Sequence, residues 1–213
     1  DVEDRVILWS KRLIENPMLL KNMTVQQSAV RFDTVPLVPK TYDCTTFIET
    51  VMALSRSSEM GEFAKNLMKI RYKEGQPGYF NRNHFPEGDW IPNNVSAGVI
   101  QDITKEVAEK SNVRAQVVEK ELAKKKWFAE QKPFLSVGRS LASTFESQIE
   151  FVPEVQKASL AYIPLDSFEK VANNIPNGSI LNIVHVNSDN HPVLVSHQGI
   201  LVRKGSQLYF RHA

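Results

Sequence analysis

Residues 41–50 read TYDCTTFIET and contain the only cysteine of this 213-residue chain. Asp43 is a residue type that caps helix N-termini well, so we predict a helix from Cys44 to about residue 56. Residues recur along it at spacings of three, four and three, which places them on one face: Cys44, Phe47, Val51 and Leu54. We expect this face to pack on a sheet, with Cys44 at the boundary between core and solvent.

A cysteine in the first turn of a helix has two interpretations. The partial positive charge and free N–H groups of a helix N-terminus favour the nucleophilic thiolate, and the same N–H groups can hydrogen-bond an oxyanion. Cysteine is also a common small buried residue without chemical function. The residues around Cys44 leave both interpretations open, so the choice depends on finding a base.

Two of the five histidines, His197 and His212, fall in the last two predicted strands. If Lys204-Gly205 is a two-residue turn, His197 lies directly opposite His212 on one face of a hairpin. Two imidazoles so placed can hydrogen-bond, one acting as base to a cysteine and the other orienting it. We also expect Gly199 to leave open space beside His197.

The histidine face of this hairpin also carries apolar residues, so we expect the cysteine helix to cover it: Val193, Val195 and Leu201. Alternatively, each histidine is an ordinary core or edge residue, and a register slip of one residue would separate the pair. The combination of a cysteine at a helix start with two facing histidines favours a Cys–His–His nucleophilic site.

The order of the predicted elements indicates an α+β protein. We predict helices near residues 3–15, 44–56, 59–72, 99–110 and 114–131, extended chain at 30–40, and a loop at 76–94. Strands are predicted near 146–152, 158–163, 179–186, 193–203 and 207–212, with a short helix near 166–173. We expect a single catalytic domain, residues 1–213, with a mainly helical insertion at about 58–145.

Composition excludes several classes of protein. The hydrophobic fraction is 42%, the charged fraction is 23% and the formal net charge is +2, all ordinary for a soluble globular protein. The lysines at 120 and 124–126 alternate with glutamates as on a solvated helix face, so we expect no nucleic-acid partner. No apolar run is long enough to span a bilayer. One cysteine cannot form an internal disulfide, and we expect a monomer.

Three segments, DCTTF, SHQGI and YFRHA, resemble the NlpC-type cysteine hydrolases of bacterial cell walls. The resemblance implies a papain-like core in which the cysteine helix packs on an antiparallel sheet that bears the histidines. By match, Cys44 is the nucleophile, His197 the general base and His212 the orienting residue. The sequence departs from the family at Gly178-Ser179, where Gly-Asp is usual, and relatives continue past the position of Ala213, so we expect the C-terminal end to be incomplete.

Four longer segments are similar to one branch of that superfamily, the large-insert N-acetylmuramoyl-L-alanine amidases: YDCTTFIETVMALS, YFNRNHFPEGDWIPNN, AYIPLDSFEKVANNIPNGSILNIV and VSHQGILVRKG. The branch implies hydrolysis of the amide between N-acetylmuramic acid, in some cases the 1,6-anhydro form, and L-alanine in peptidoglycan fragments during murein recycling. It also implies export to the periplasm or cell envelope. No metal or organic cofactor is expected.

The loop at 76–94 supplies most of the expected substrate contacts. Tyr79 and Trp90 offer flat faces for sugar rings, and Arg82 can pair with a carboxylate. The remaining expected contacts are polar groups of the loop and residues beside the catalytic ones: Asn81, His84, Asp89, Tyr42, Asp43 and Ser196. The alternative is that the loop merely caps the core, with its aromatic rings buried.

Three other functions remain compatible with these residues. The same catalytic groups can cut a stem-peptide bond such as D-glutamyl to diaminopimelate. A cell-wall-binding module without turnover is a second alternative, although it would have no need of cysteine and both histidines. A zinc hydrolase is the third, but no ligand spacing such as H-E-x-x-H is present.

Overall fold

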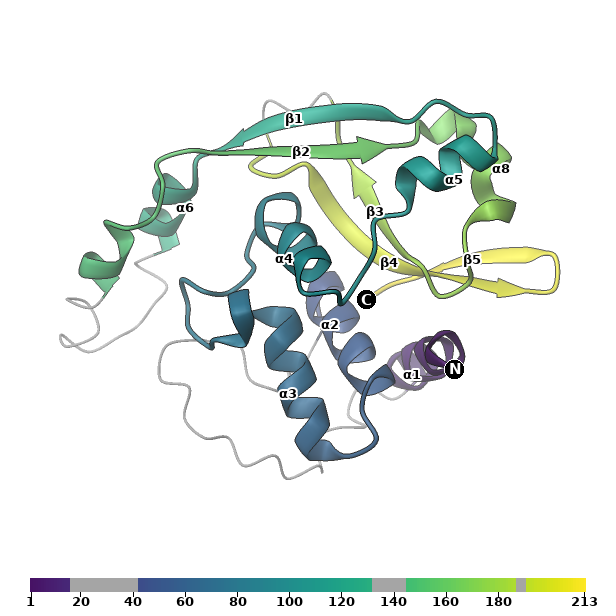
Figure 1. Cartoon of the computed structure of the whole chain (residues 1–213), viewed down its shortest axis with the longest axis horizontal. Helices are drawn as coiled ribbons and strands as arrows, with labels where there is room; N and C mark the ends of the chain where they lie inside the picture. The colour runs from purple at the N-terminus through teal and green to yellow at the C-terminus, as the bar shows by residue number, and fades with distance from the viewer. Residues whose placement is uncertain (16–41, 132–144, 187–190) are drawn as a thin grey trace.

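The structure, a computed structural model, describes residues 1–15, 42–131, 145–186 and 191–213. The extended chain expected at 30–40 lies outside these residues. The described part is a mixed α+β fold with two antiparallel sheets. Figure 1 shows α1, α2 and α3 gathered on one side and the long β1–β2 ribbon on the other, with β3, β4 and β5 between them.

Three helices form the layer that carries Cys44: α1 (Val2–Glu15), α2 (Cys44–Ser55) and α3 (Met60–Arg71). All three are confirmed where the sequence predicts them. From Thr46 to Ser55, α2 is buried at every position, and it packs between α1, α3 and β4. Phe47, Ile48 and Val51 are at most 1% exposed, so α2 lies at the centre of the main core.

The principal sheet has the order β3 (Ile180–Val184), β4 (Val195–Lys204), β5 (Gln207–Arg211), all antiparallel. The two faces of β4 belong to different cores. Ile200 and Val202 pack with α2, whereas Leu201 packs with residues of α5 (Thr104–Lys110) and α8 (Phe168–Val171). The expectation that α2 covers the Leu201 face is therefore wrong, because α2 covers the alternate residues.

A second sheet pairs β1 (Gln116–Leu122) with β2 (Gln156–Tyr162). The helix predicted at 114–131 is wrong over its first half, which is β1, and correct over α6 (Lys124–Gln131). The strand predicted at 146–152 is also wrong, because residues 145–149 are helical and a turn follows. The described part of the insertion is therefore not purely helical.

The long loop contains more regular structure than the sequence predicts. A single π-helical turn, η2 (Pro86–Trp90), leads directly into α4 (Ile91–Ser96). Short 3₁₀ turns lie elsewhere in the chain: η1 (Lys73–Gly75), η4 (Leu165–Ser167) and η5 (Ala172–Asn174).

In the parts of the chain described above, no helix combines the length and the apolar character needed to cross a membrane.

Candidate active site

The start of α2 is held by a complete capping box. The Asp43 carboxylate accepts the backbone N–H of Thr46 at 2.7 Å, and the Thr46 hydroxyl oxygen accepts the N–H of Asp43 at 3.0 Å. These bonds satisfy donors that a helix N-terminus otherwise leaves free. Cys44, the first helical residue, is half-buried, and its Sγ lies 3.9 Å from the Thr45 hydroxyl.

The same turn is hydrogen-bonded to the central strand of the sheet. The Thr45 hydroxyl donates to Oε1 of Gln198, 3.1 Å away. Gln198 is 1% exposed, and its amide nitrogen donates in turn to Asn182 on β3. A buried side-chain amide with both ends bonded has a fixed orientation. This series of hydrogen bonds therefore holds Thr45, the residue after Cys44, against Gln198, the residue after His197.

The β4–β5 hairpin differs from the predicted register by two residues. Its turn is Gly205-Ser206, with Gly205 at φ +59°, and Lys204 pairs with Gln207. His197 is thus not directly opposite His212. Because side chains alternate with a period of two, a two-residue shift keeps both imidazoles on one face. Their ring centroids are 4.8 Å apart and their planes are nearly perpendicular, at 82°.

Phe210 completes this histidine pair. Its ring stacks on His212 with a centroid distance of 5.3 Å and meets His197 edge-on at 5.9 Å. The ring lies directly over Gly199, where an added Cβ would be 2.5 Å from two ring carbons. The expectation of open space at Gly199 is therefore wrong: glycine is needed there because Phe210 occupies that space.

The surroundings of His197 favour its neutral form. Burial lowers the pKa of His197, and the charge that His212 can carry lowers it further. Nε2 of His197 is buried and has no hydrogen-bond partner among the described residues. A neutral imidazole with an unused nitrogen can accept a proton, which is what a general base requires.

The histidine pair and the cysteine reach the site from different sides of β4. His197 alternates with Gln198, which faces the first turn of α2. The β5 ladder ends at the pair of Ile200 with Arg211, so nearer its start β4 has no β5 partner among the described pairs. Among the described residues, Cys44 and His197 are linked through the hydrogen bond of their neighbours Thr45 and Gln198 and not by a direct hydrogen bond.

Most of the loop residues expected to bind substrate are engaged within the fold. Trp90 is 1% exposed and part of the main core, so a sugar-stacking role for its ring does not hold in this structure. The Asp89 carboxylate forms an ion pair with Lys124 at 2.5 Å. Arg82 is 10% exposed and lies 4.0 Å from the carboxylate of Glu49.

Tyr79 and His84 belong to an aromatic cluster between the loop and α6. His84 donates from Nε2 to the carbonyl oxygen of Tyr79 at 2.7 Å, and both rings contact Phe128. Tyr79 keeps partial exposure, and Asn81 is exposed. The interpretation that the loop caps the core therefore accounts for most of its aromatic residues.

The residues that flank the catalytic candidates have mixed surroundings. Tyr42 packs edge-on to Phe47, and its hydroxyl is buried without a partner among the described residues. Burial raises the pKa of Tyr42, partly offset by the positive charge of Arg71. Ser196 is exposed, and its hydroxyl hydrogen-bonds His185 at 2.8 Å.

Sequence reasoning missed two buried carboxylates near the site. Glu49 of α2 is 1% exposed and accepts from Nε of Arg71, also 1% exposed, at 2.7 Å. Glu87 of η2 is 2% exposed and accepts backbone N–H groups at the start of β4. A lone glutamate inside the apolar run CTTFIETVMALS was a usable signal for Glu49, since acidic residues are rarely buried without a partner.

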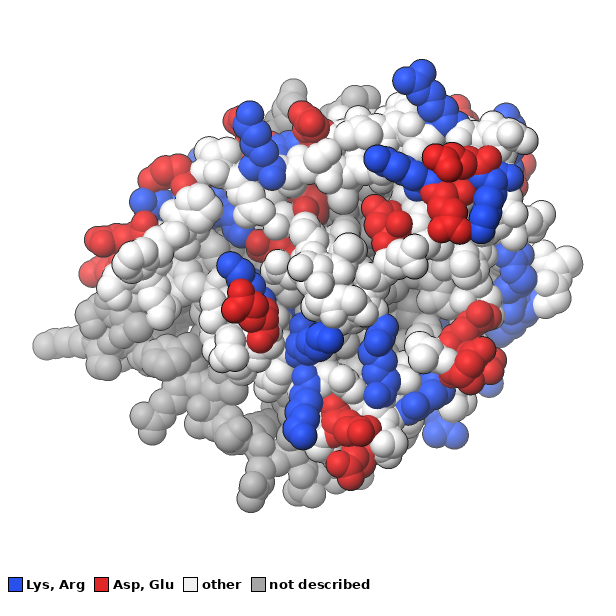
Figure 2. All heavy atoms as spheres, in the orientation of Figure 1, with Lys and Arg blue, Asp and Glu red and all other residues white. Residues whose placement is uncertain are grey.

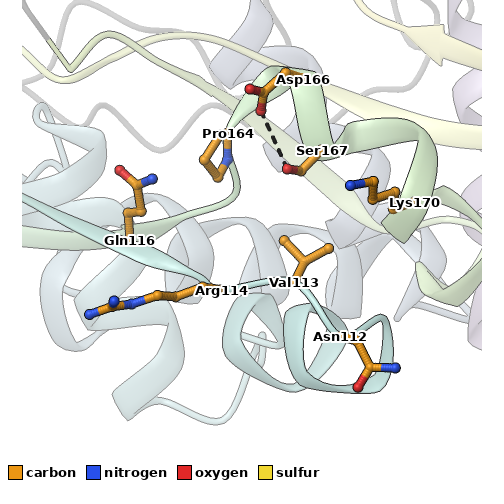
Figure 3. Close-up of a pocket in the computed structure, with 8 residues that line it drawn as sticks. All are labelled: Asn112, Val113, Arg114, Gln116, Pro164, Asp166, Ser167 and Lys170. Carbon is orange, nitrogen blue, oxygen red and sulfur yellow. Dashed lines mark hydrogen bonds between the residues drawn. The ribbon is translucent and has the colours of Figure 1, made fainter.

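Other surface features lie away from these residues. A cavity of about 350 Å³ lies between α5, β1 and η4. Its lining, labelled in Figure 3, includes Arg114, Asp166 and Lys170 and none of the predicted site residues. Figure 2 shows acidic and basic side chains interspersed over the described part of the face in view. Within the described residues, no group of three or more His, Cys, Asp or Glu side chains is arranged to hold a metal ion.

Comparison with known proteins identifies relatives along nearly the whole chain. A family model described as AmiA-like, N-acetylmuramoyl-L-alanine amidase-like, matches residues 10–213. No curated protein sequence matches the chain.

Several solved structures share this fold. A Legionella pneumophila protein assigned to the DUF1460 family superposes with a TM-score of 0.80 at 24% identity, over 100% of this chain and 78% of its own. Two structures named N-acetylmuramoyl-L-alanine amidase from Bacteroides uniformis give TM-scores of 0.56 at 19% identity and 0.52 at 23% identity. The first covers 100% of this chain and 85% of its own, the second 80% and 69%.

Proposed function

Because the chain belongs to the AmiA-like, N-acetylmuramoyl-L-alanine amidase-like family, we propose that it is a cysteine amidase of peptidoglycan. The scissile bond is the amide between N-acetylmuramic acid, in its ordinary or its 1,6-anhydro form, and L-alanine. The substrate is a soluble peptidoglycan fragment, and the site of action is the periplasm or cell envelope. The proposal includes a papain-like arrangement of helix and sheet and no cofactor.

Catalysis begins with proton transfer from the Cys44 thiol to His197. The thiolate attacks the lactyl carbonyl carbon of the muramic acid, and the carbonyl electron pair moves to oxygen as the C–S bond forms. The backbone N–H of Cys44, free at a helix N-terminus, donates to that oxyanion. The C–N bond then breaks, and His197 returns its proton to the departing amine of L-alanine.

Hydrolysis of the thioester completes the cycle. His197 takes a proton from water, the hydroxide attacks the acyl carbon, and the C–S bond breaks to release the muramic acid carboxyl group and the Cys44 thiolate. The carboxyl group then loses its proton to solvent, and His197 returns the proton that it holds to Cys44. His212 orients the base, and the Phe210 ring that contacts both imidazoles limits their rotation. Tyr79 and Asn81, which keep exposed surface, are the loop residues best suited to touch substrate.

The Thr45–Gln198 hydrogen bond is the observation that carries this proposal. It fixes the capped turn that begins at Cys44 against the strand that bears His197. It places the first turn of α2, with the half-buried Cys44, beside β4. This placement supports the proposal because a nucleophile and its base have to be held on neighbouring elements.

The test is digestion of a defined muropeptide by the wild type, Cys44→Ala and Cys44→Ser, with products identified by mass spectrometry. We expect an intact stem peptide from the wild type and a loss of at least about a thousandfold in both variants. A truncated stem peptide would instead identify an endopeptidase. Full activity in both variants would exclude the cysteine mechanism.

A further inference from the structure

The π-helical turn η2 contacts both the helical layer and the strand that carries His197. It lies in the loop that sequence reasoning assigned to substrate contact. Single π-helical turns are rare and occur often at functional sites. Hydrogen bonds join this turn to the start of β4 on one side and to β2 and α6 on the other.

On one side, Glu87 of η2 binds the start of β4. Its Oε1 accepts the backbone N–H of Leu194 at 2.6 Å, and its Oε2 lies 3.4 Å from the N–H of Val195. The carboxylate is 2% exposed, and the described contacts give it backbone donors and no cationic partner. Bonds from N–H groups to a buried carboxylate are strong and directional, because the charge has no competing water. Val195 is two residues before His197.

On the other side, the residues next to Glu87 are fixed to the second sheet. The carbonyl oxygen of Gly88 accepts from Gln156 at 2.7 Å, and Lys124 bridges Asp89 and Gln156 at 2.5 and 2.9 Å. An added Cβ at Gly88 would lie 2.5 Å from Leu122 of β1. The turn therefore cannot shift toward β1 or away from it without breaking contacts.

An earlier part of the same loop contacts α2 and α3. Arg82 lies 4.0 Å from the Glu49 carboxylate of α2, and the backbone N–H of Asn83 donates to the carbonyl oxygen of Arg71, the last residue of α3, at 3.0 Å. Residues 82–90 thus connect the helix that begins at Cys44 with the strand that carries His197. They do so through two buried carboxylates, Glu49 at one end and Glu87 at the other.

We propose that Glu87 is a positioning residue of the proposed amidase, which sets the place of His197 by holding the first residues of β4 against the 82–90 segment. This inference rests on the proposed function for its kinetic consequence, but its structural claim concerns β4 alone. In this role residues 82–90 hold the proposed nucleophile helix and the strand of the proposed base in place, and substrate binding is not their main task.

The test compares the full chain with Glu87→Gln, Glu87→Ala and a matched control, Val107→Ala. Glu87→Gln keeps the shape but replaces one acceptor by a donor that faces an N–H group, and Glu87→Ala removes both acceptors. Val107 is 4% exposed in the core behind Leu201, so its truncation costs stability without touching the start of β4. Hydrogen exchange of the Leu194 amide, the titration of His197 by NMR, and kcat and KM for a muropeptide are measured.

We expect faster exchange at Leu194 in both Glu87 variants and an upward shift of the pKa of His197, because its burial lessens. The value of kcat should fall about tenfold in Glu87→Gln and about a hundredfold in Glu87→Ala, with KM within about twofold. Val107→Ala should change none of these beyond about threefold at a temperature where it is folded.

The positioning role is overturned if Glu87→Gln and the Val107→Ala control show the same exchange rate of the Leu194 amide and the same titration of His197. This holds even if the wild type proves to be a cysteine amidase. Conversely, a wild type without Cys44-dependent hydrolysis would overturn the proposed function, while the exchange and titration results still decide the role of Glu87.

Discussion

The hydroxyl of Thr45 donates to the side-chain oxygen of Gln198, 3.1 Å away, and so joins the neighbour of Cys44 to the neighbour of His197. Thr45 lies in the first turn of α2, and Gln198 is buried in β4. This bond between neighbours limits how far Cys44 and His197 can move relative to each other, although neither of them takes part in it. The spacing of the proposed dyad is therefore sensitive to side chains that do no chemistry.

Replacement of Thr45 by valine tests this control, because valine keeps the shape and removes the donor. We expect kcat on a muropeptide to fall about ten- to a hundredfold, since small displacements of reacting groups have effects of this size. Thr45→Ser keeps the hydroxyl and should retain most activity. Loss of activity in the serine variant equal to that in the valine variant would show that the hydroxyl is not what matters.

The pH dependence of the reaction should reveal the pairing of the two histidines. Burial and the charge of His212 lower the pKa of His197, so neutral His197 persists to pH values below the ordinary histidine range near 6.5. The acid limb of kcat/KM should therefore lie below that pH in the wild type. In His212→Gln the charge is absent, protonation of His197 becomes easier, and the limb should move to higher pH. A limb that moves to lower pH would contradict the pairing.

Gly199→Ala tests the packing of Phe210 against the hairpin. The new methyl group would lie 2.5 Å from the Phe210 ring and 2.9 Å from the carbonyl oxygen of Arg211, so the ring must move and its stack on His212 must open. We expect a loss of about 1–3 kcal/mol in the free energy of unfolding in urea, as for other overpacked cores. Gly199→Ala combined with Phe210→Leu should recover part of this loss. Equal stability of Gly199→Ala and wild type would contradict the packing described.

Asp43→Ala tests the helix cap alone. The change removes the acceptor of the Thr46 N–H and hydroxyl, so the free energy of unfolding should fall by about 0.5–2 kcal/mol. Asp43→Asn and Asp43→Ser, which also cap well, should retain most of that energy. If all three variants unfold at the same urea concentration as the wild type, the cap does not stabilise α2 measurably.

The sequence was sufficient for the parts of the fold that depend on local pattern. The Cys44 helix, its Asp43 cap and the final hairpin are confirmed, because apolar spacing, capping chemistry and a glycine turn all act within a few residues. The hairpin turn was misplaced, yet the histidines stayed on one face because the error was an even number of residues.

The segments that failed are those where distant contacts decide. Residues 116–122 have the charged composition of a helix but form β1, because β2 offers a pairing partner forty residues away. Tyr79 and Trp90 appeared available for sugars in the sequence, and only the tertiary packing shows Trp90 buried in the main core and Tyr79 partly covered by the cluster around Phe128. The hydrogen bonds that Glu49 and Glu87 accept likewise depend on partners at distant positions in the sequence, Arg71 and the start of β4.

The division of β4 between two cores has a consequence for how the molecule acquires its site. One face of the strand is completed by α2, and the other by α5 and α8. A partly folded chain that has assembled only one of these layers leaves the other face of β4 in water, and such a strand does not keep its place. The proposed arrangement of Cys44 and His197 therefore depends on both layers, so a variant that loosens the packing on either face of β4 should lose activity as well as stability.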